Sequence, residues 1–412
     1  MEHFDIGIIG GGPAGYTSAL YYKKQGKSVV LFEKDEVGGT CLNRGCIPTK
    51  AFLHIADLYS ELNGADKLGI NFDNLNLDFE KVKEYKNNVV SKLRKGLELT
   101  LKNSGIIVIK EQAEITSKDR IKAGETEYCC KKIIVATGSK PKEIKGLEYN
   151  HKFILSSDDI LELEHLPKSV LIVGSGAIGI EWARILSSFN VEVTIVELAQ
   201  TLCPHADWEV SKRIERQFKM KKIKTYLACS VDKIEDKKVT LSNGEIVEPD
   251  CVLVAVGREA NESKNDFNAD VIGDASAEIM LAHYAVSQAK ELVFDIPFNK
   301  KTVPSVIYGT PEIAWVGEVS KSKEEDEKYD KSMLLISALG KAHCDNNIDG
   351  FIKILSKDGK LKGASIVSKE ASSLIQQITI AMDNDITVKD LKKTCFAHPT
   401  YSEGIQEVIM GL

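Results

Sequence analysis

The chain has 412 residues, of which 43% are hydrophobic and 28% charged, and its formal net charge is −6. This length exceeds one ordinary hydrophobic core, so we expect two to four domains, and the net negative charge argues against a nucleic-acid-binding protein. No apolar run is long enough to cross a bilayer, and the N-terminus enters a strand pattern by Phe4 without a targeting segment, so we expect a cytoplasmic protein. The nine cysteines do not match a secreted disulfide framework, and we expect any disulfide to be catalytic.

The first glycine-rich loop has the pattern G-x-G-x-x-G and lies between a predicted strand at residues 4–9 and a predicted helix at residues 16–25. Its glycines permit a tight turn and a close approach of the backbone to a pyrophosphate; they are Gly10, Gly12 and Gly15. The next predicted strand ends at Glu33, which can accept a hydrogen bond from a ribose hydroxyl. The order strand, helix, strand predicts a dinucleotide site; a purely structural turn is the alternative.

A second loop of the same pattern follows a predicted strand at residues 169–173 and precedes a predicted helix at residues 180–189. Its glycines are Gly174, Gly176 and Gly179. The following strand ends at Glu197, and no arginine stands beside it to receive a 2′-phosphate, so we expect this site to prefer NAD to NADP. Two such units predict two dinucleotides, with a vestigial second site as the alternative.

Several further strands end in small or acidic residues. Thr137, Gly138 and Gly257 follow apolar strands, where small residues let the backbone pass close to a cofactor. Asp274 ends another short strand and could bind a hydroxyl of the first dinucleotide, or could be an ordinary exposed acid. From about residue 302 the pattern changes to alternating strands and helices without glycine loops, which predicts a third domain of α+β type.

Two cysteines, Cys41 and Cys46, lie in the segment GGTCLNRGCIPTK at residues 38–50. Gly45 and Pro48 favour an irregular backbone there, so a small disulfide between the cysteines is possible. A zinc site would need a second Cys or His pair at ligand spacing, which the sequence lacks, and ordinary packing is the remaining alternative.

A reactive thiolate needs a neighbouring positive charge or a base. His398 precedes a proline and is followed by Glu403, so the two are candidates for a base and the carboxylate that orients it. A structural histidine in a loop is the alternative, and the assignment gains weight only beside the cysteine pair.

Together these motifs resemble the flavoprotein disulfide reductases, class I of the pyridine nucleotide-disulfide oxidoreductases, from Phe4 to the C-terminus. The segments CLNRGCIP and MLAH are more typical of the lipoamide branch than of the glutathione or mercuric branches. The resemblance implies an α/β fold with two Rossmann-like domains, for FAD and NAD, and a C-terminal α+β dimerisation domain. The implied boundaries are residues 1–147 with a shortened second part at 258–297 for FAD, 148–257 for NAD, and 298–412 for the interface domain.

The resemblance also implies an activity: NAD-dependent oxidation of protein-bound dihydrolipoyl groups through FAD and a redox-active Cys41–Cys46 disulfide. The enzyme would serve a 2-oxo acid dehydrogenase or glycine cleavage system. Because family members are head-to-tail homodimers, His398 and Glu403 would act on the cysteines of the other subunit. Cys41 would face the substrate and Cys46 the flavin.

The cofactor-binding residues are likewise implied by the resemblance. An ion pair of Lys50 and Glu181 would lie beside the flavin. The FAD site would comprise Gly10, Gly12, Gly15, Glu33, Thr40, Lys50, Ala113, Thr137, Gly138, Asp274, Met280, Leu281, Ala282 and His283. The NAD site would comprise Gly174, Gly176, Ile178, Gly179, Glu197, Val231 and Gly257.

The chain departs from the family in three places. Only fifteen residues separate Arg258 from Asp274, and the segment after His283 is short, which predicts a reduced cover for the adenine half of FAD. Thr310 stands before Pro311 where the family usually has a histidine. Two other functions stay open: another FAD-dependent disulfide or metal-ion reductase, such as a glutathione-like one, and a non-catalytic flavoprotein that binds partners. The lack of a C-terminal cysteine pair argues against thioredoxin or mercury reduction.

Overall fold

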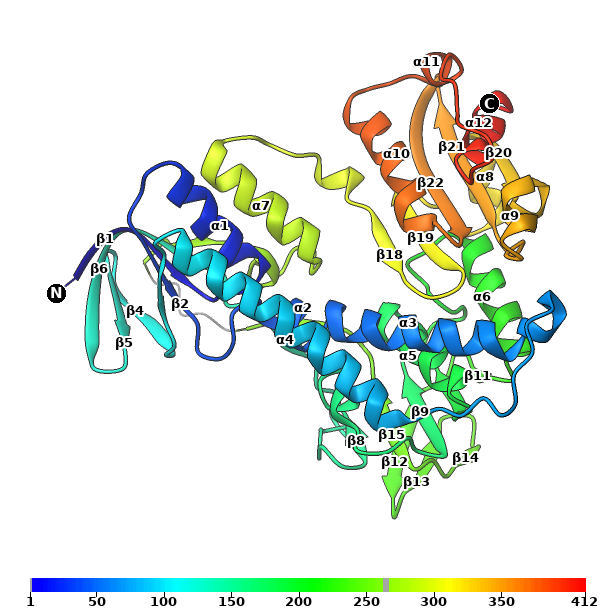
Figure 1. Ribbon diagram of the computed structural model, residues 1–412, viewed down its shortest axis with the longest axis horizontal. Coiled ribbons are helices and arrows are strands. Elements are labelled where there is room, and N and C mark those ends of the chain that lie inside the picture. The colour runs from blue at the N-terminus through cyan, green and yellow to red at the C-terminus, as the bar shows by residue number, and fades with distance from the viewer. Residues whose placement is uncertain (1, 262–266) are drawn as a thin grey trace.

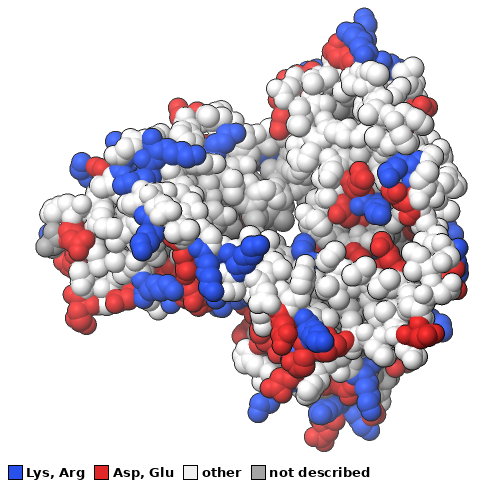
Figure 2. All heavy atoms as spheres, viewed as in Figure 1, with Lys and Arg blue, Asp and Glu red and all other residues white. Residues whose placement is uncertain are grey.

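The computed structural model describes residues 2–261 and 267–412, so part of the shortened 258–274 connection lies outside the described residues. Figure 1 shows three sheet-centred units, with the first at the left of the view, the second at the bottom right and the third at the top right. None of the helices formed by the described residues is long and apolar enough to span a membrane. Acidic and basic side chains are interspersed over the face in view in Figure 2.

The first unit is built on a seven-stranded sheet of order β3-β2-β1-β6-β5-β4, with β17 pairing with the C-terminal end of β6. Strand β1 is parallel to β2 and β6, and the β2 strand is buried along its whole length, as expected of a parallel sheet covered on both faces. The strands are β1 Glu2–Ile9, β2 Val29–Phe32, β3 Ile107–Ile109, β4 Ala113–Ser117, β5 Arg120–Ala123, β6 Thr126–Val135 and β17 Asp270–Val271. The helices of this part of the chain are α1 Pro13–Lys24, α2 Gly39–Arg44, α3 Cys46–Asn63, α4 Phe79–Asn103 and α7 Ala282–Phe294.

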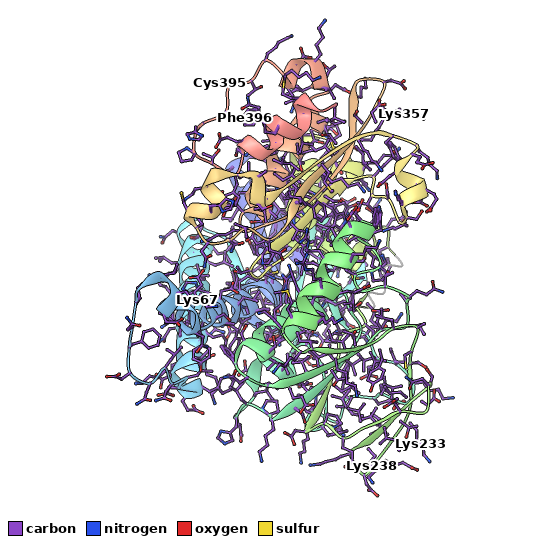
Figure 3. The ribbon with its side chains drawn as sticks, turned by 90° about the vertical axis from the view of Figure 1, so that its right-hand side faces the viewer. Lys67, Lys233, Lys238, Lys357, Cys395 and Phe396 are labelled. Atoms are coloured by element: carbon purple, nitrogen blue, oxygen red, sulfur yellow. The ribbon has the colours of Figure 1, made fainter. Side chains whose placement is uncertain are left out.

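The second unit repeats the parallel arrangement in a five-stranded sheet of order β11-β10-β9-β15-β8. A separate three-stranded antiparallel sheet lies at its outer end, where Figure 3 labels Lys233 and Lys238. The elements are β8 Ile154–Leu155, β9 Ser169–Val173, α5 Ala177–Ser188, β10 Glu192–Val196, α6 Trp208–Met220, β11 Lys224–Tyr226, β12 Val231–Glu235, β13 Lys238–Leu241, β14 Ile246–Val247 and β15 Cys251–Val254. The first and second units are also joined by a two-stranded ribbon of β7 Ser139–Pro141 and β16 Arg258–Ala260.

The third unit is a five-stranded antiparallel sheet of order β18-β19-β22-β21-β20, with α10 packed against it. Figure 3 shows it above the second unit, with Cys395 and Phe396 at its far end. Its strands and helices are β18 Ser305–Ile307, β19 Glu312–Gly317, α8 Lys323–Asp326, β20 Asp330–Leu335, α9 Gly340–Cys344, β21 Phe351–Lys357, β22 Lys360–Ser368, α10 Ala371–Asp383, α11 Val388–Leu391 and α12 Glu403–Met410. Short 3-10 helices are η1 Ala65–Leu68, η2 Asp159–Glu162, η3 Gly273–Ser276, η4 Lys300–Thr302 and η5 Ile336–Ala338.

A buried ion network joins the second and third units. The Lys353 ammonium on β21 donates to Asp207 Oδ2 at 2.9 Å and to Asp326 Oδ1 at 2.6 Å, and all three side chains are at most 3% exposed. Asp207 also caps the first turn of α6 by accepting from the Glu209 N–H at 3.0 Å. The network therefore fixes the start of α6 against the sheet of the third unit.

Replacing Lys353 by methionine should lower the free energy of unfolding by about 3–5 kcal/mol, because Asp207 then stays buried without a counter-charge and Asp326 keeps only its ion pair with Lys331. Burial acts to raise the pKa of Asp326, but hydrogen bonds from Lys353 and Trp208, the Ser320 hydroxyl and the charge of Lys353 together outweigh it and lower the pKa to about 2. Because this pKa is depressed, the stabilisation is present above the ordinary Asp pKa and is lost as the pH falls towards 2. Denaturant unfolding at pH 7 measures the effect, and the exposed Lys357→Met on the same strand is the matched control. Equal stability of the two variants would contradict this account.

Candidate active site

The first glycine loop has the close backbone contacts that its sequence predicts. Gly10 has φ +106°, and a Cβ there would lie 2.2 Å from the Ala136 carbonyl oxygen. A Cβ on Gly15 would lie 1.8 Å from the Gly10 carbonyl oxygen, so this glycine allows α1 to pack against the loop. The Gly11 N–H donates to Glu33 Oε2 at 2.7 Å, which places the carboxylate at the loop. The first unit thus presents a backbone turn, a helix N-terminus and an acid at one place.

The second glycine loop repeats this geometry in detail. Gly174 has φ +101°, and a Cβ on Gly179 would lie 2.1 Å from the Gly174 carbonyl oxygen. The Ser175 N–H donates to Glu197 Oε2 at 2.8 Å, which matches the contact between Gly11 and Glu33 in the first loop. The repeated geometry indicates a second dinucleotide site of the same kind.

A single cavity of about 1750 Å³ extends from the first loop past the cysteines to the second loop. It is lined by every predicted FAD residue except Gly15 and by every predicted NAD residue except Gly179. Gly15 and Gly179 instead let the helices α1 and α5 pack closely against the glycine loops that precede them. Cys41, Cys46, Lys50 and Glu181 also line the cavity. Ala113 and Val231, for which the sequence held no motif of its own, also line this cavity.

The first half of this cavity fits the FAD that the family resemblance implies. The Thr137 hydroxyl is buried there without a hydrogen-bond partner among the described residues. Asp274 Oδ2 lies on the same wall and accepts a hydrogen bond from the Ser139 hydroxyl at 2.5 Å. Residues 280–283 line the wall at the start of α7, and burial lowers the pKa of His283, which favours its neutral form. Polar groups of this kind suit a ligand that carries hydroxyls and a pyrophosphate.

The cysteine pair lies where α2 ends and α3 begins. Gly45 separates the two helices, and a Cβ there would lie 2.9 Å from the Thr40 carbonyl oxygen. Both thiols are free in this structure. Hydrogen bonding from Cys41, supported by the positive charge of Lys50, lowers the pKa of Cys46 to about 7 despite burial. The same contact and burial raise the pKa of Cys41. Cys46 is therefore the thiolate of the reduced pair near neutral pH.

Lys50 and Glu181 form an ion pair beside the cysteines. The Lys50 ammonium lies 2.8 Å from Glu181 Oε2 and 3.0 Å from Oε1. The Tyr308 N–H donates to Glu181 Oε1 at 3.0 Å, and the Lys50 ammonium lies 4.5 Å from the centre of the Tyr308 ring. The pair therefore links α3, α5 and the strand β18 that begins the third unit.

His398 and Glu403 lie in contact with each other but apart from the cysteines of their own chain. His398 Nδ1 lies 2.7 Å from Glu403 Oε1, and the Thr400 N–H donates to Glu403 Oε2 at 2.8 Å. The Thr400 N–H and the His398 ring lower the pKa of Glu403, which keeps it ionised. The His398 side chain is 78% exposed, and neither residue is among the described residues that line the large cavity. The ring is oriented and open to a second molecule.

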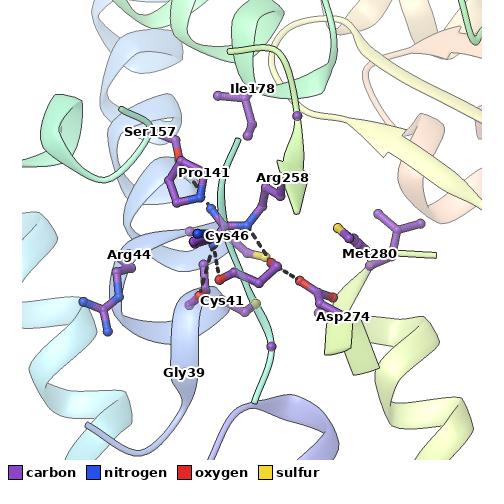
Figure 4. Close-up of a pocket in the computed structure, with 18 of the residues that line it drawn as sticks. Gly39, Cys41, Arg44, Cys46, Pro141, Ser157, Ile178, Arg258, Asp274 and Met280 are labelled. Atoms are coloured by element: carbon purple, nitrogen blue, oxygen red, sulfur yellow. Dashed lines mark hydrogen bonds between the residues drawn. The ribbon is translucent and has the colours of Figure 1, made fainter. Parts of the chain in front are cut away.

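Arg258 occupies a central position that the sequence did not reveal. Its Nε donates to the Ser139 hydroxyl at 2.8 Å and its Nη2 to the Ser139 carbonyl at 2.8 Å. Figure 4 shows it in the pocket with Cys41, Cys46 and Asp274. The only sequence signal was the position of Arg258 directly after Gly257 at a strand end. Arg258 reaches Ser139 because β7 pairs with β16, which brings these two distant segments of the chain together.

No metal centre is formed by the described residues, since they contain no group of three or more His, Cys, Asp or Glu side chains that could hold an ion. The cavity that holds the cysteine pair is also lined by Lys50, Glu181 and residues of both glycine loops.

Comparison with known proteins identifies the family. The family described as "Pyridine nucleotide-disulphide oxidoreductase" matches residues 4–271, and its dimerisation domain matches residues 303–409. The chain is 33% identical to the dihydrolipoyl dehydrogenase of Chlamydia pneumoniae, covering 98% of this chain and 95% of that protein. It is 32% identical to the dihydrolipoyl dehydrogenase of Bacillus subtilis, covering 99% and 98%.

Solved structures agree on the fold. The chain superposes on LpdA from Mycobacterium tuberculosis with a TM-score of 0.91, at 24% identity over 100% of this chain and 99% of that one. These matches confirm the predicted α/β architecture with two dinucleotide-binding units and a C-terminal dimerisation domain, and the family implies FAD and NAD as cofactors. The chain belongs to the pyridine nucleotide-disulphide oxidoreductase family.

Proposed function

We propose that the protein oxidises dihydrolipoyl groups to lipoyl groups with NAD as the acceptor. The single observation that carries the proposal is that Cys41 and Cys46 line the same cavity as both glycine loops. The curated relatives named dihydrolipoyl dehydrogenase support the choice of substrate. The lipoyl group would be carried by a protein of a 2-oxo acid dehydrogenase or glycine cleavage complex. A cytoplasmic location stays a prediction.

The proposed domains follow the three sheets. Residues 1–147 and 258–297 form the FAD domain, residues 148–257 the NAD domain, and residues 298–412 the interface domain. In support, β17 pairs with β6 of the first sheet although the whole second sheet separates them in the chain. The antiparallel sheet of the third unit begins at β18, after residue 298.

FAD would be held by the first loop, Glu33, Asp274 and the start of α7, and NAD by the second loop and Glu197. When bound, FAD supplies the two-electron exchange that connects the dithiol to NAD. Lys50 and Glu181 hold the end of the first turn of α3 in place, and the positive charge of Lys50 favours the Cys46 thiolate.

The thiol chemistry starts from a Cys41–Cys46 disulfide. His398 of the partner subunit, oriented by its glutamate, takes the proton of one dihydrolipoyl thiol. The resulting thiolate attacks Cys41 Sγ, which forms a mixed disulfide and breaks the Cys41–Cys46 bond, so that Cys46 leaves as a thiolate. The second dihydrolipoyl sulfur then attacks the first and releases Cys41, which takes up a proton. The lipoyl group loses two electrons and the cysteine pair gains them.

This scheme requires a homodimer. The dimerisation domain supports association, and the exposed, oriented His398 supports a role on another subunit. A monomer would lack the base at its own cysteines.

Glu197 should determine the preference for NAD. Glu197→Ala should raise the KM for NAD by about tenfold, since about 1.5 kcal/mol of hydrogen bonding to the ribose is lost. The preference for NAD over NADP should fall by the same factor, because the carboxylate no longer repels a 2′-phosphate. Steady-state kinetics with both nucleotides measures this, and Glu235→Ala on the outer three-stranded sheet is the matched control. An unchanged ratio of the two kcat/KM values would show that Glu197 does not contact the ribose.

The proposed function is tested by an anaerobic assay of the FAD-loaded protein with dihydrolipoamide and NAD, run beside glutathione disulfide and NADPH. We expect turnover with the first pair only. Turnover with NADPH and glutathione disulfide alone would assign the protein to another branch, and pure protein that binds no FAD would exclude both enzyme functions.

A further inference from the structure

A second cavity, of about 530 Å³, lies between α6 of the second unit and the third unit. Figure 1 shows α6 directly below the third unit. None of its described lining residues also lines the large cavity, so it is separate from the cofactor sites. It is lined by Arg184, Arg213, Arg216, Gln217, Phe218, Met220, Lys221, Thr310, Pro311, Leu335, Ser337, Ile348, Asp349 and Gly350.

The charge of this lining is unbalanced. It contains four cations, Arg184, Arg213, Arg216 and Lys221, and one carboxylate, Asp349. That carboxylate is already used, because Asp349 Oδ1 lies 2.6 Å from Arg213 Nη1. Within the described chain, Arg184, Arg216 and Lys221 make no ion pair within 4 Å, and the one further carboxylate that acts on Arg184 and Lys221 without another ion-pair partner is Asp57. Cations therefore outnumber carboxylates around this pocket.

Arg184 is the least expected of these cations, since it is only 4% exposed. Its guanidinium donates to two neutral acceptors, the Tyr308 carbonyl at 2.9 Å and Gln217 Oε1 at 3.1 Å. Burial lowers the pKa of Arg184, which reflects the cost of a buried charge without a counter-ion. Asp57 lies nearby; burial raises its pKa, while the charges of Arg184 and Lys221 act to lower it.

The local backbone accommodates this arginine. Gly309 has φ +125°, and a Cβ at that position would lie 2.8 Å from Arg184 Cδ and 2.9 Å from its Nη1. Any other residue at 309 would displace the guanidinium. Although much of the Lys221 residue is exposed, its ammonium is desolvated at the pocket wall, and this together with the charge of Arg184 lowers its pKa. The pocket therefore gathers more cations than the carboxylates of Asp57 and Asp349 balance.

We propose that this pocket binds a small polyanion of the phosphate-ester or diphosphate class. Arg184 would lie at the buried side of the ligand, and Arg216 and Lys221 at the open side. Arginine guanidinium groups suit this chemistry because they donate in pairs to phosphate oxygens. Three cations that make no ion pair among the described residues, opposed by the single carboxylate of Asp57, match a ligand with about two negative charges.

Tyr308 connects this pocket to the active-site ion pair of Lys50 and Glu181. The Tyr308 carbonyl accepts from Arg184, while the Tyr308 N–H donates to Glu181, the partner of Lys50. A ligand on Arg184 would therefore lie behind Glu181, on the side opposite the cysteines and the large cavity.

The test is isothermal titration of the FAD-loaded, NAD-saturated dimer with inorganic pyrophosphate at low ionic strength. Bound FAD blocks the first dinucleotide site, and saturation with NAD blocks the second. We expect one site per chain. Arg216→Gln and Lys221→Gln should each weaken binding by about tenfold through loss of a charge-assisted hydrogen bond. Lys219→Gln, an exposed lysine on the same helix outside the pocket, should change it by less than about twofold.

Two results would overturn the proposal. The first is the absence of saturable heat, as in a dimer whose second subunit covers the pocket. The second is an equal loss of affinity in Lys219→Gln and Arg216→Gln, which would reveal only a diffuse surface charge. Arg184→Met should abolish binding, but its burial can affect folding, so the decision rests on the two exposed positions.

Discussion

Cys41→Ser and Cys46→Ser should each lower dihydrolipoamide turnover by on the order of 10⁴-fold, because the two sulfurs act as one unit and neither alone can form the disulfide. The matched control is Cys344→Ser, an exposed cysteine of the third unit that should keep full activity. Steady-state assays of the three FAD-loaded variants measure the effect. Either active-site variant keeping more than about a tenth of the wild-type rate would contradict the assignment of the pair.

The two variants should also differ from each other. Cys46 holds the lowered pKa, and it is the cysteine assigned to the flavin side. Cys41→Ser should therefore keep the long-wavelength absorption that a Cys46 thiolate gives beside bound FAD, and Cys46→Ser should lose it. The reverse result would exchange the roles of the two cysteines.

His398→Gln should lower turnover by about 10²–10⁴-fold, the usual effect of removing a general base. Glu403→Gln should have a smaller effect, because His398 remains but loses the carboxylate 2.7 Å from its Nδ1. His343→Gln, an exposed histidine of the same unit, is the matched control. Turnover by His398→Gln at the wild-type rate would show that the base is another group.

Mixed dimers determine whether His398 acts across the subunit interface. Neither His398→Gln nor Cys46→Ser is active alone, but a heterodimer of the two has one site with both the cysteines and the base. Random assembly of the two chains should restore about a quarter of the wild-type activity. If His398 served its own subunit, no chain would hold both groups and no activity would return.

Much of the fold was predictable because the parallel strands are short, buried and followed by glycine loops. Glu33 and Glu197 could be assigned from the loops alone, and each accepts a hydrogen bond from a backbone N–H of its glycine loop. The antiparallel β4–β5 hairpin was not predicted, because its strands have only five and four residues and their alternation is too short to stand out in the sequence.

Parts of the site whose residues lie close together in the sequence could be predicted from it, whereas contacts between distant segments could not. The cysteine pair is contained in one segment, whereas the ion pair of Lys50 with Glu181 joins residues 131 positions apart and came from family resemblance. The contacts of Arg258 and Tyr308 were not predicted. Arg258 reaches Ser139 only through the pairing of β7 with β16, and Tyr308 contacts Glu181 through its backbone N–H. Backbone donors carry no sequence signature.

The most direct measurement is an anaerobic titration of the FAD-loaded dimer with dihydrolipoamide, followed at long wavelength and then by addition of NAD. The account predicts that one equivalent per subunit generates the absorption of a Cys46 thiolate beside FAD and that NAD abolishes it. The band should be half-developed near pH 7 and grow as the pH rises, since the pKa of Cys46 is lowered to about 7. A spectrum that dihydrolipoamide leaves unchanged, in protein that binds FAD, would contradict the transfer of electrons through Cys41 and Cys46.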